Sequence, residues 1–303
     1  MQYIITATTL NLRNGPSLND AIVGTLLNGQ AVDVTNNSNP DWWFVSAIVN
    51  GNTINGYVAS RYLREIPVLT AQQLNPHGVT AVHYAKSPES NRASINARHA
   101  PLSEANLPQR NIGAGATPAT KITDVYTIVN FLDVVNSARY QPTKSTYCNI
   151  YAYDFCYLAQ AYLPRVWWTS KTLMEFAKTP GYNPTPAYGK NVEELNANAL
   201  YNWLDEWGDD FGWVRTYDLT DFQGKVNDGR VGIICAKRRD LSRSGHITCV
   251  VPEANGFVAQ REGVKVIAPL QSQAGSKNKK FFSEDWWVRL AKVFSNSGYW
   301  YHD

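Results

Sequence analysis

Cys148 stands at the predicted start of a helix, where a thiol can act as a nucleophile. Ser145 or Thr146 is a suitable N-cap, apolar residues follow at helical spacing, and Pro164 ends the segment. The first turn of a helix offers unpaired backbone N–H groups and the positive end of the helix dipole, and both stabilise a thiolate. The sequence therefore predicts that Cys148 has anionic character near neutral pH and attacks a carbonyl carbon.

His246 is the candidate base for this cysteine. Gly245 and His246 open the second of two apolar β runs, which are joined by a polar loop. A strand that packs beside the cysteine helix brings the imidazole to the thiol, where it can take the proton and later protonate a leaving amine. A cysteine at a helix start and a histidine at a strand start together predict a cysteine hydrolase.

The remaining cysteines, Cys156, Cys235 and Cys249, are interpreted as core thiols. The chain has no CxxC pair, so neither a disulfide framework nor a zinc site made of Cys148, His246 and Cys249 is favoured. We expect no metal and no cofactor. An inert, buried Cys148 is the plain alternative to the catalytic interpretation.

Residues 1–66 have the pattern of a small all-β domain. Short runs of alternating hydrophobicity are separated by clusters of Gly, Asn, Pro and Asp, which predicts a compact barrel of about five or six strands. Several motifs resemble, in order and spacing, those of bacterial SH3 (SH3b) domains: Leu12-Arg13-Asn14-Gly15-Pro16, Gly24, Gly29, Trp42-Trp43-Phe44-Val45, Gly56-Tyr57-Val58 and Tyr62-Leu63. The resemblance implies a module that targets the cell wall or shapes a substrate groove.

The rest of the chain divides into a connector and a second domain. Residues 67–120 are rich in Pro, Ser, Asn and Ala and predict an extended connector that wraps the second domain. The second domain is expected over residues 121–303, and its first helix over residues 122–140, where apolar residues recur at helical spacing.

This second domain resembles papain-like peptidoglycan hydrolases of the NlpC/P60 and CHAP (cysteine, histidine-dependent amidohydrolase/peptidase) kinds. The resemblance rests on Cys148 with its helix, on the strand start Gly245-His246-Ile247 and on the SH3b domain in front. It implies an α+β fold in which a helix packs on an antiparallel sheet.

The resemblance also implies a third polar residue that orients the imidazole. NlpC/P60 members commonly use a second histidine, but only His302 follows His246, at the end of the chain. The next predicted strand offers Gln271 and Gln273, which share one face, and an amide oxygen can accept the imidazole N–H as a carboxylate would. We rank Gln271 first, Gln273 second and Glu253, which closes the histidine strand, third.

Substrate contacts are expected from aromatic and basic side chains. Trp167 and Trp168 follow the cysteine helix and could stack on glycan or stem peptide, with core packing as the alternative. Arg243, in the basic loop before the histidine strand, could attract substrate carboxylates or simply be solvated. The backbone N–H of Cys148, with that of Tyr147, would stabilise the oxyanion.

Composition excludes several other functions. The 303 residues are 44% hydrophobic and 17% charged, and the net charge of +3 is too small to favour a nucleic-acid partner. No apolar run of about eighteen residues suggests a membrane-spanning helix, and no signal peptide is visible at the start. The oligomeric state is left open.

The resulting hypothesis is a peptidoglycan hydrolase that acts at the cell wall, whether secreted, periplasmic or released by a phage. Cys148 and His246 would cleave stem-peptide amide bonds through an acyl-enzyme. The resemblance suggests the γ-D-glutamyl-diamino acid bond, with the N-acetylmuramoyl-L-alanine amide as the alternative. A non-catalytic wall-binding adaptor and an acyltransferase or transglutaminase on the same scaffold also remain open.

Overall fold

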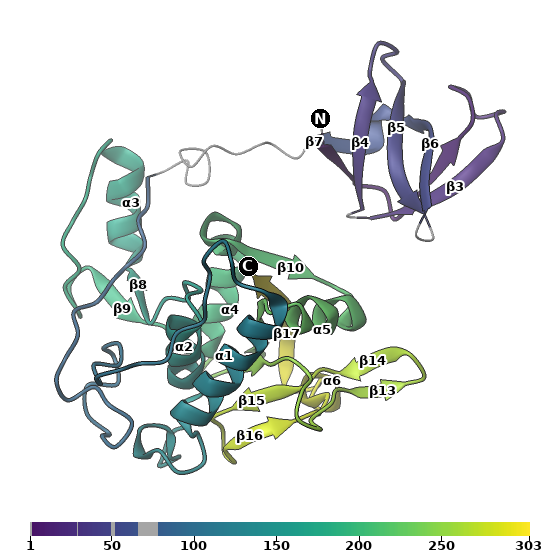
Figure 1. Ribbon diagram of the computed structural model, residues 1–303. Helices are drawn as coiled ribbons and strands as arrows, with labels where there is room; N and C mark the ends of the chain where they lie inside the picture. The colour runs from purple at the N-terminus through teal and green to yellow at the C-terminus, as the bar shows by residue number, and fades with distance from the viewer. Residues whose placement is uncertain (1, 29, 50–51, 66–77) are drawn as a thin grey trace. The chain divides into compact units, whose positions relative to one another are not determined.

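The chain folds around separate cores in two units. The computed structural model describes residues 2–28, 30–49, 52–65 and 78–303. Contacts divide the chain into Met1–Ala71 and Gln72–Asp303, shown in Figure 1. The first part of the predicted connector, residues 67–77, lies outside the described residues.

The first unit is all-β, as its sequence pattern predicts. One antiparallel sheet has the strand order β3-β2-β6-β5-β4-β1-β7, and its core contains the buried side chains of Leu12, Leu26, Val45 and Val58. Its elements are β1 (Gln2–Ile5), β2 (Thr9–Arg13), β3 (Ile22–Leu27), β4 (Ala31–Asn36), β5 (Trp42–Val49), β6 (Asn52–Ala59), the 3-10 turn Ser60–Tyr62 and β7 (Leu63–Glu65). These strands exceed the five or six expected, because the first apolar run divides into β1 and β2 and a short β7 pairs with β1.

The second unit is α+β and is built on an antiparallel sheet of order β10-β17-β11-β12-β15-β16. Its helices are α1 (Pro118–Leu132), α2 (Cys148–Leu158), α3 (Ser170–Lys178), α4 (Ala197–Glu206), α5 (Leu219–Asn227) and α6 (Trp286–Arg289). The sheet strands are β10 (Trp213–Thr216), β11 (Val231–Arg238), β12 (His246–Val250), β15 (Gln271–Gln273), β16 (Lys279–Phe282) and β17 (Phe294–His302). Two small ribbons lie outside it: β8 (Val166–Trp168) with β9 (Val192–Glu194), and β13 (Gln260–Glu262) with β14 (Lys265–Ala268).

Helices cover both faces of this sheet. Because side chains alternate along a strand, Ile247 and Cys249 of β12 join the core formed with α1, α2 and α4. Val250 belongs to a second core, with Phe222 of α5 and Trp286 of α6. The strand that begins with His246 is therefore enclosed by helices on two sides.

The helix expected over residues 122–140 is shorter at its end. α1 begins after the N-cap Thr117 and stops at Asp133, which adopts a left-handed conformation with φ 40°. The apolar pattern continues because Val134 and Tyr140 are fully buried although neither lies in α1. These two apolar residues are buried beyond the end of α1, and their spacing made the predicted helix too long at its C-terminal end.

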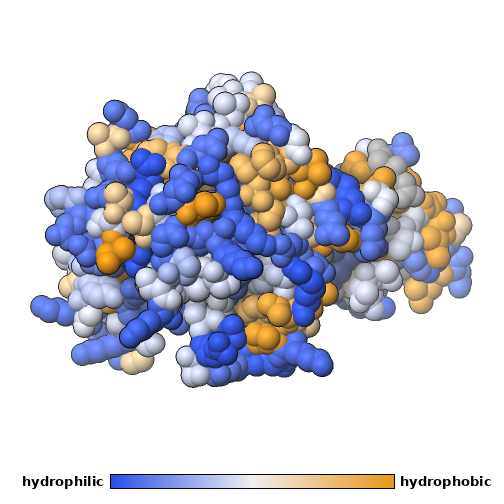
Figure 2. Space-filling model, turned by 90° about the horizontal axis from the view of Figure 1, so that it is seen from below, coloured by the Kyte–Doolittle hydropathy of each residue, from blue (hydrophilic) through white to orange (hydrophobic). Residues whose placement is uncertain are grey.

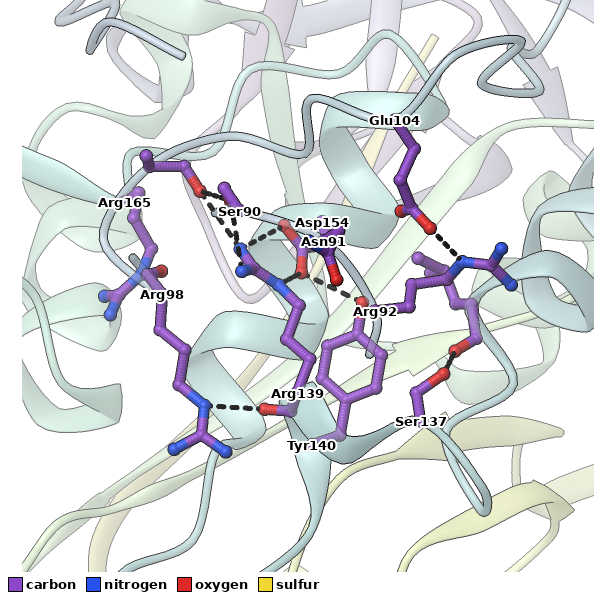
Figure 3. Close-up of polar contacts among 12 residues, drawn as sticks. Ser90, Asn91, Arg92, Arg98, Glu104, Ser137, Arg139, Tyr140, Asp154 and Arg165 are labelled. Atoms are coloured by element: carbon purple, nitrogen blue, oxygen red, sulfur yellow. Dashed lines mark hydrogen bonds and ion pairs between the residues drawn. The ribbon is translucent and has the colours of Figure 1, made fainter. Parts of the chain in front are cut away.

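Residues 78–117 have no helix or strand and are held to the rest of the second unit by arginine side chains. Arg139 pairs with Asp154 of α2 through Nε and Oδ2 at 2.6 Å, and both side chains are fully buried. Its remaining guanidinium nitrogens donate to Ser90 Oγ at 3.1 Å and to the Ala100 carbonyl oxygen at 3.0 Å (Figure 3). Arg98 in turn donates to the Arg139 carbonyl oxygen at 2.8 Å. These bonds join the segment to α2 and to Arg139, and they give the Ala100 carbonyl oxygen a donor that no β ladder supplies.

The face of the molecule drawn in Figure 2 is mostly polar. Figure 2 shows a face on which hydrophilic residues predominate and apolar residues gather in small separate groups. Within the described ranges, no helix is long and apolar enough to cross a bilayer.

The buried ion pair generates a prediction about stability. Asp154→Ala should lower the free energy of unfolding of the second unit by about 3–5 kcal/mol, because the Arg139 guanidinium stays buried without its carboxylate. Urea denaturation followed by circular dichroism measures this change. The control is Asp205→Asn, which removes a partly exposed pair with Arg215 and should cost less than about 1 kcal/mol. Equal effects of the two changes would contradict the prediction.

Candidate active site

Cys148 is the first residue of α2, as predicted, but the helix is capped differently. The N-cap residue is Tyr147, and its side chain makes no capping hydrogen bond, so neither Ser145 nor Thr146 is the cap. The helix ends at Leu158, before Pro164. The Cys148 side chain is only 2% exposed, because the first turn of α2 is packed into the core against the sheet.

Burial changes the expected charge of this thiol. Desolvation raises the pKa of Cys148 above its ordinary value, although backbone N–H groups of Ile247, Asn149 and Cys148 itself oppose the shift. The thiolate expected near neutral pH is thus a wrong prediction for the resting protein. Amides at the helix start stabilise the anion, but in a buried first turn the loss of water outweighs them.

His246 opens β12 and has a defined hydrogen-bond partner. Its Nε2 lies 2.7 Å from Oε1 of Gln273. An amide oxygen can only accept, so Nε2 carries the hydrogen, and in the neutral ring the lone pair is on Nδ1. Desolvation lowers the pKa of His246, and the bond to Gln273 partly opposes that shift. The resting imidazole is therefore a neutral base with Nδ1 free to accept a proton.

The amide of Gln273 is fixed in orientation. Its Nε2 donates to the Lys277 carbonyl oxygen at 3.2 Å, which directs Oε1 toward His246. The imidazole also packs against Trp286 of α6. The two ring centroids lie 4.7 Å apart in an edge-to-face arrangement.

Gln271, ranked first from the sequence, does not contact His246. It is fully buried, and its Oε1 accepts hydrogen bonds from Thr248 Oγ1 at 2.9 Å and from Trp286 Nε1 at 2.8 Å. Gln271 thus holds the tryptophan that packs on the histidine, while Gln273 makes the direct bond. β15 runs antiparallel to β12 with Gln271 opposite Val250, so Gln273, two residues further on, comes closer to His246 at the start of β12.

Glu253 is also placed away from the histidine. Both of its carboxylate oxygens bind the Arg261 guanidinium at 2.5 Å, and Oε2 accepts from Asn227 Nδ2 at 2.9 Å. These bonds lower the pKa of Glu253 to about 2. It anchors the β13–β14 ribbon instead of orienting the imidazole.

Gly245 is required by the packing just before His246. A Cβ at this position would lie 2.2 Å from the Ala236 carbonyl oxygen and 2.7 Å from Asn198 Oδ1. Any larger residue would push the start of β12 away from β11, and His246 with it. The Gly-His pair that marked this site in the sequence therefore has a steric reason.

A cavity of about 420 Å³ opens beside His246, Gln273 and Trp286. Thr146, two residues before Cys148, also lines it, so the cavity begins next to the first turn of α2. This volume is sufficient for a short peptide segment or a small ligand.

The charges around this cavity are mainly positive. Arg238, Lys277, Lys279 and Arg289 line it together with one carboxylate, Glu284. Lys279 and Arg289 both pair with Glu284, whereas Lys277 is exposed and forms no ion pair with the part of the chain that the structure describes. The excess of cations favours a ligand with carboxylates.

The predicted substrate residues lie elsewhere. Trp167 and Trp168 are 4% and 2% exposed and belong to the core, so the expectation that they stack on substrate is wrong. Arg243 is exposed but does not line the cavity at His246. The Arg98 guanidinium carbon lies 3.7 Å from the centroid of the Tyr147 ring. The role of the Tyr147 backbone N–H in binding the oxyanion stays a prediction.

Trp286 and the cations after β15 were missed from the sequence. The signal available was the basic and aromatic composition of residues 277–289, which follow the predicted orienting strand. No group of three or more His, Cys, Asp or Glu side chains within the described ranges is arranged to hold a metal ion. Cys156, Cys235 and Cys249 are buried free thiols, in agreement with their interpretation as core residues.

The opposite pKa shifts generate a prediction about thiol reactivity. Because the Cys148 pKa is raised and the His246 pKa is lowered, both groups are neutral between the two values. The rate of Cys148 alkylation by iodoacetamide should rise by about tenfold per pH unit from pH 7 to pH 9. Peptide mapping by mass spectrometry measures it, with Cys148→Ser as the blank. A rate that is flat from pH 5 upward would instead indicate a preformed thiolate–imidazolium pair.

Comparison with known proteins bears mainly on the first unit. Residues 8–64 match the sequence profile described as the bacterial SH3 domain. Among solved structures, the chain is similar to NlpC2 from Trichomonas vaginalis, with 10% identity and a TM-score of 0.19 over 94% of this chain and 71% of that one. NlpC1 from the same organism gives 10% identity and a TM-score of 0.20 over 99% and 70%. Among curated protein sequences, none matches. The chain therefore contains a bacterial SH3 domain at residues 8–64, followed by an α+β unit that carries the cysteine and histidine.

Proposed function

We propose that the second unit is a papain-like cysteine hydrolase that cleaves an amide bond in the stem peptides of peptidoglycan. The observation that carries the proposal is the 2.7 Å hydrogen bond between His246 Nε2 and Gln273 Oε1. It lies at the strand start where the next residue, Ile247, offers its N–H to the Cys148 sulfur. A thiol at a helix start, an imidazole with a free Nδ1 and an amide that orients it are the three parts such a hydrolase needs.

The proposed reaction begins from the neutral pair. As substrate binds, Nδ1 of His246 takes the Cys148 proton and the sulfur attacks the carbonyl carbon. The oxygen of the tetrahedral intermediate accepts hydrogen bonds from backbone N–H groups, among them that of Cys148 and, in this proposal, that of Tyr147. The imidazolium then gives its proton to the leaving amine, and a thioester remains. Water activated by His246 attacks the thioester, which releases the carboxylic acid and restores the thiol.

Two features support a peptidoglycan substrate. The bacterial SH3 domain in the same chain supports a role at the bacterial wall. The cavity at His246 has a net positive charge, which suits stem peptides because they carry free carboxylates. The γ-D-glutamyl-diamino acid bond has such a carboxylate close to the scissile amide, and we propose it as the bond that is cut.

Digestion of purified sacculi tests the proposal. The unchanged protein should release soluble fragments whose masses identify the bond, and Cys148→Ala should release none because the nucleophile is lost. Circular dichroism of the variant shows whether it is folded. Equal release by both proteins would exclude Cys148, and no release by either would favour a wall-binding adaptor. Fragments with a free muramoyl carboxyl group would identify the amidase bond instead.

Two further variants separate orientation of the base from binding of substrate. Gln273→Ala should lower kcat by about 100-fold with little change in KM, because the imidazole loses its fixed orientation. Lys277→Ala should raise KM by about threefold to tenfold and leave kcat nearly unchanged, because only a cation near the substrate carboxylates is removed. Initial rates on a soluble stem peptide measure both. The reverse pattern, or no effect of Gln273→Ala, would contradict the assignment.

A further inference from the structure

A second cavity, of about 450 Å³, lies on the second unit between residues 82–109 and the C-terminal half of α2. It shares no lining residue with the cavity at His246. The lining side chains that carry an aromatic ring or an amide are His83, Tyr84, Gln109, Tyr153, Tyr157, Gln160 and Tyr162. The function proposed above uses none of them.

The aromatic rings form an ordered wall. Tyr153 and Tyr157 are one turn apart on α2, and their rings are close to parallel, with an interplanar angle of 21° and centroids 6.1 Å apart. Neither hydroxyl has a hydrogen-bond partner in the ranges that the structure describes. Tyr162 is fixed by the Val82 N–H, which donates to its hydroxyl at 2.7 Å, and His83 meets its ring edge-on at 5.7 Å. The wall thus offers ring faces together with two free hydroxyl groups.

Gln160 occupies a backbone position where glycine is the usual residue. It follows the C-cap of α2 with φ 57°, a left-handed conformation that costs energy for a residue with a Cβ. Its Nε2 donates to the Arg110 carbonyl oxygen at 3.2 Å and to Gln109 Oε1 at 3.3 Å. The Gln160 amide is thus held in place beside the cavity, where its oxygen can still accept a hydrogen bond from a ligand.

The chemistry of the lining indicates the class of ligand. No carboxylate lines the cavity, which argues against a cationic ligand, and Lys86 is the only lysine or arginine in the lining. Ring faces carry partial negative charge and attract the C–H face of a pyranose, while amides and phenols pair with sugar hydroxyl and acetamido groups. We propose that this cavity is a non-catalytic carbohydrate-binding site. The proposal rests on the proposed function only for the source of the sugar, which would be the glycan strand of the substrate.

The site is separate from the reacting thiol. Tyr157 follows Cys148 on the same helix, and at 1.5 Å per residue the two are about 14 Å apart along the axis. Loss of the thiol should therefore leave sugar binding unchanged. The full-length Cys148→Ala protein is then a suitable background, because it cannot consume a ligand.

Isothermal titration calorimetry with a tetramer of β-1,4-linked N-acetylglucosamine tests the site. The Cys148→Ala protein should show saturable binding, and adding Tyr157→Ala should weaken it by about tenfold. Tyr157→Phe keeps the ring and should retain most of the affinity. The matched control is Tyr217→Ala, which removes a tyrosine that is 80% exposed and does not line the cavity, and binding should not change.

Gln160→Gly guards against a variant that merely fails to fold. Glycine suits the left-handed backbone, which offsets the loss of the two side-chain hydrogen bonds, so the melting temperature should change little while affinity falls. The proposal is overturned if the background protein does not bind the tetramer. It is also overturned if Tyr157→Ala and Gln160→Gly both bind as well as that protein, which would place any sugar elsewhere on the chain. Failure of the hydrolase proposal appears only in the sacculus digestion, since this titration does not depend on catalysis.

Discussion

The hydrogen bond between His246 Nε2 and Gln273 Oε1 is the constraint on which the chemistry of this site depends. It fixes the hydrogen on Nε2 and leaves the lone pair on Nδ1. The bond in turn depends on neighbours, because Gln273 is oriented by the Lys277 carbonyl oxygen and the ring rests against Trp286. Gln271 holds that tryptophan through its indole N–H. These connected hydrogen bonds therefore determine that Nδ1 of His246 is the nitrogen that can accept a proton.

The resting charges follow from competition between desolvation and hydrogen bonding. Backbone N–H groups donate hydrogen bonds to the Cys148 sulfur, yet burial raises the pKa of this thiol. Burial also lowers the pKa of His246, although the hydrogen bond to Gln273 opposes that shift. The free-energy cost of removing a charge from water exceeds the stabilisation that a few neutral hydrogen-bond donors provide. A neutral Cys148 thiol is also less prone to oxidation than a thiolate would be.

Polar contacts help to position α2. Arg139, which follows α1, pairs with Asp154 of this helix, and it also donates to Ser90 and Ala100 in the irregular segment before α1 (Figure 3). A segment that pairs in no helix or sheet needs side-chain donors, such as this arginine, for its backbone carbonyl groups. The same segment forms one wall of the cavity beside Tyr157, so the contacts that hold α2 also shape the second proposed site.

The local features of this protein could be predicted from short-range sequence patterns. The alternating runs of the first unit, the helix that starts at Cys148 and the strand that starts at Gly245 and His246 all follow from short-range patterns, and all are present. Long-range packing places Gln273 rather than Gln271 against the histidine, buries Trp167 in the core and raises the pKa of Cys148. Periodicity assigns a residue to a face of a strand or helix, but distance along that face, burial and desolvation depend on elements that are remote in the chain.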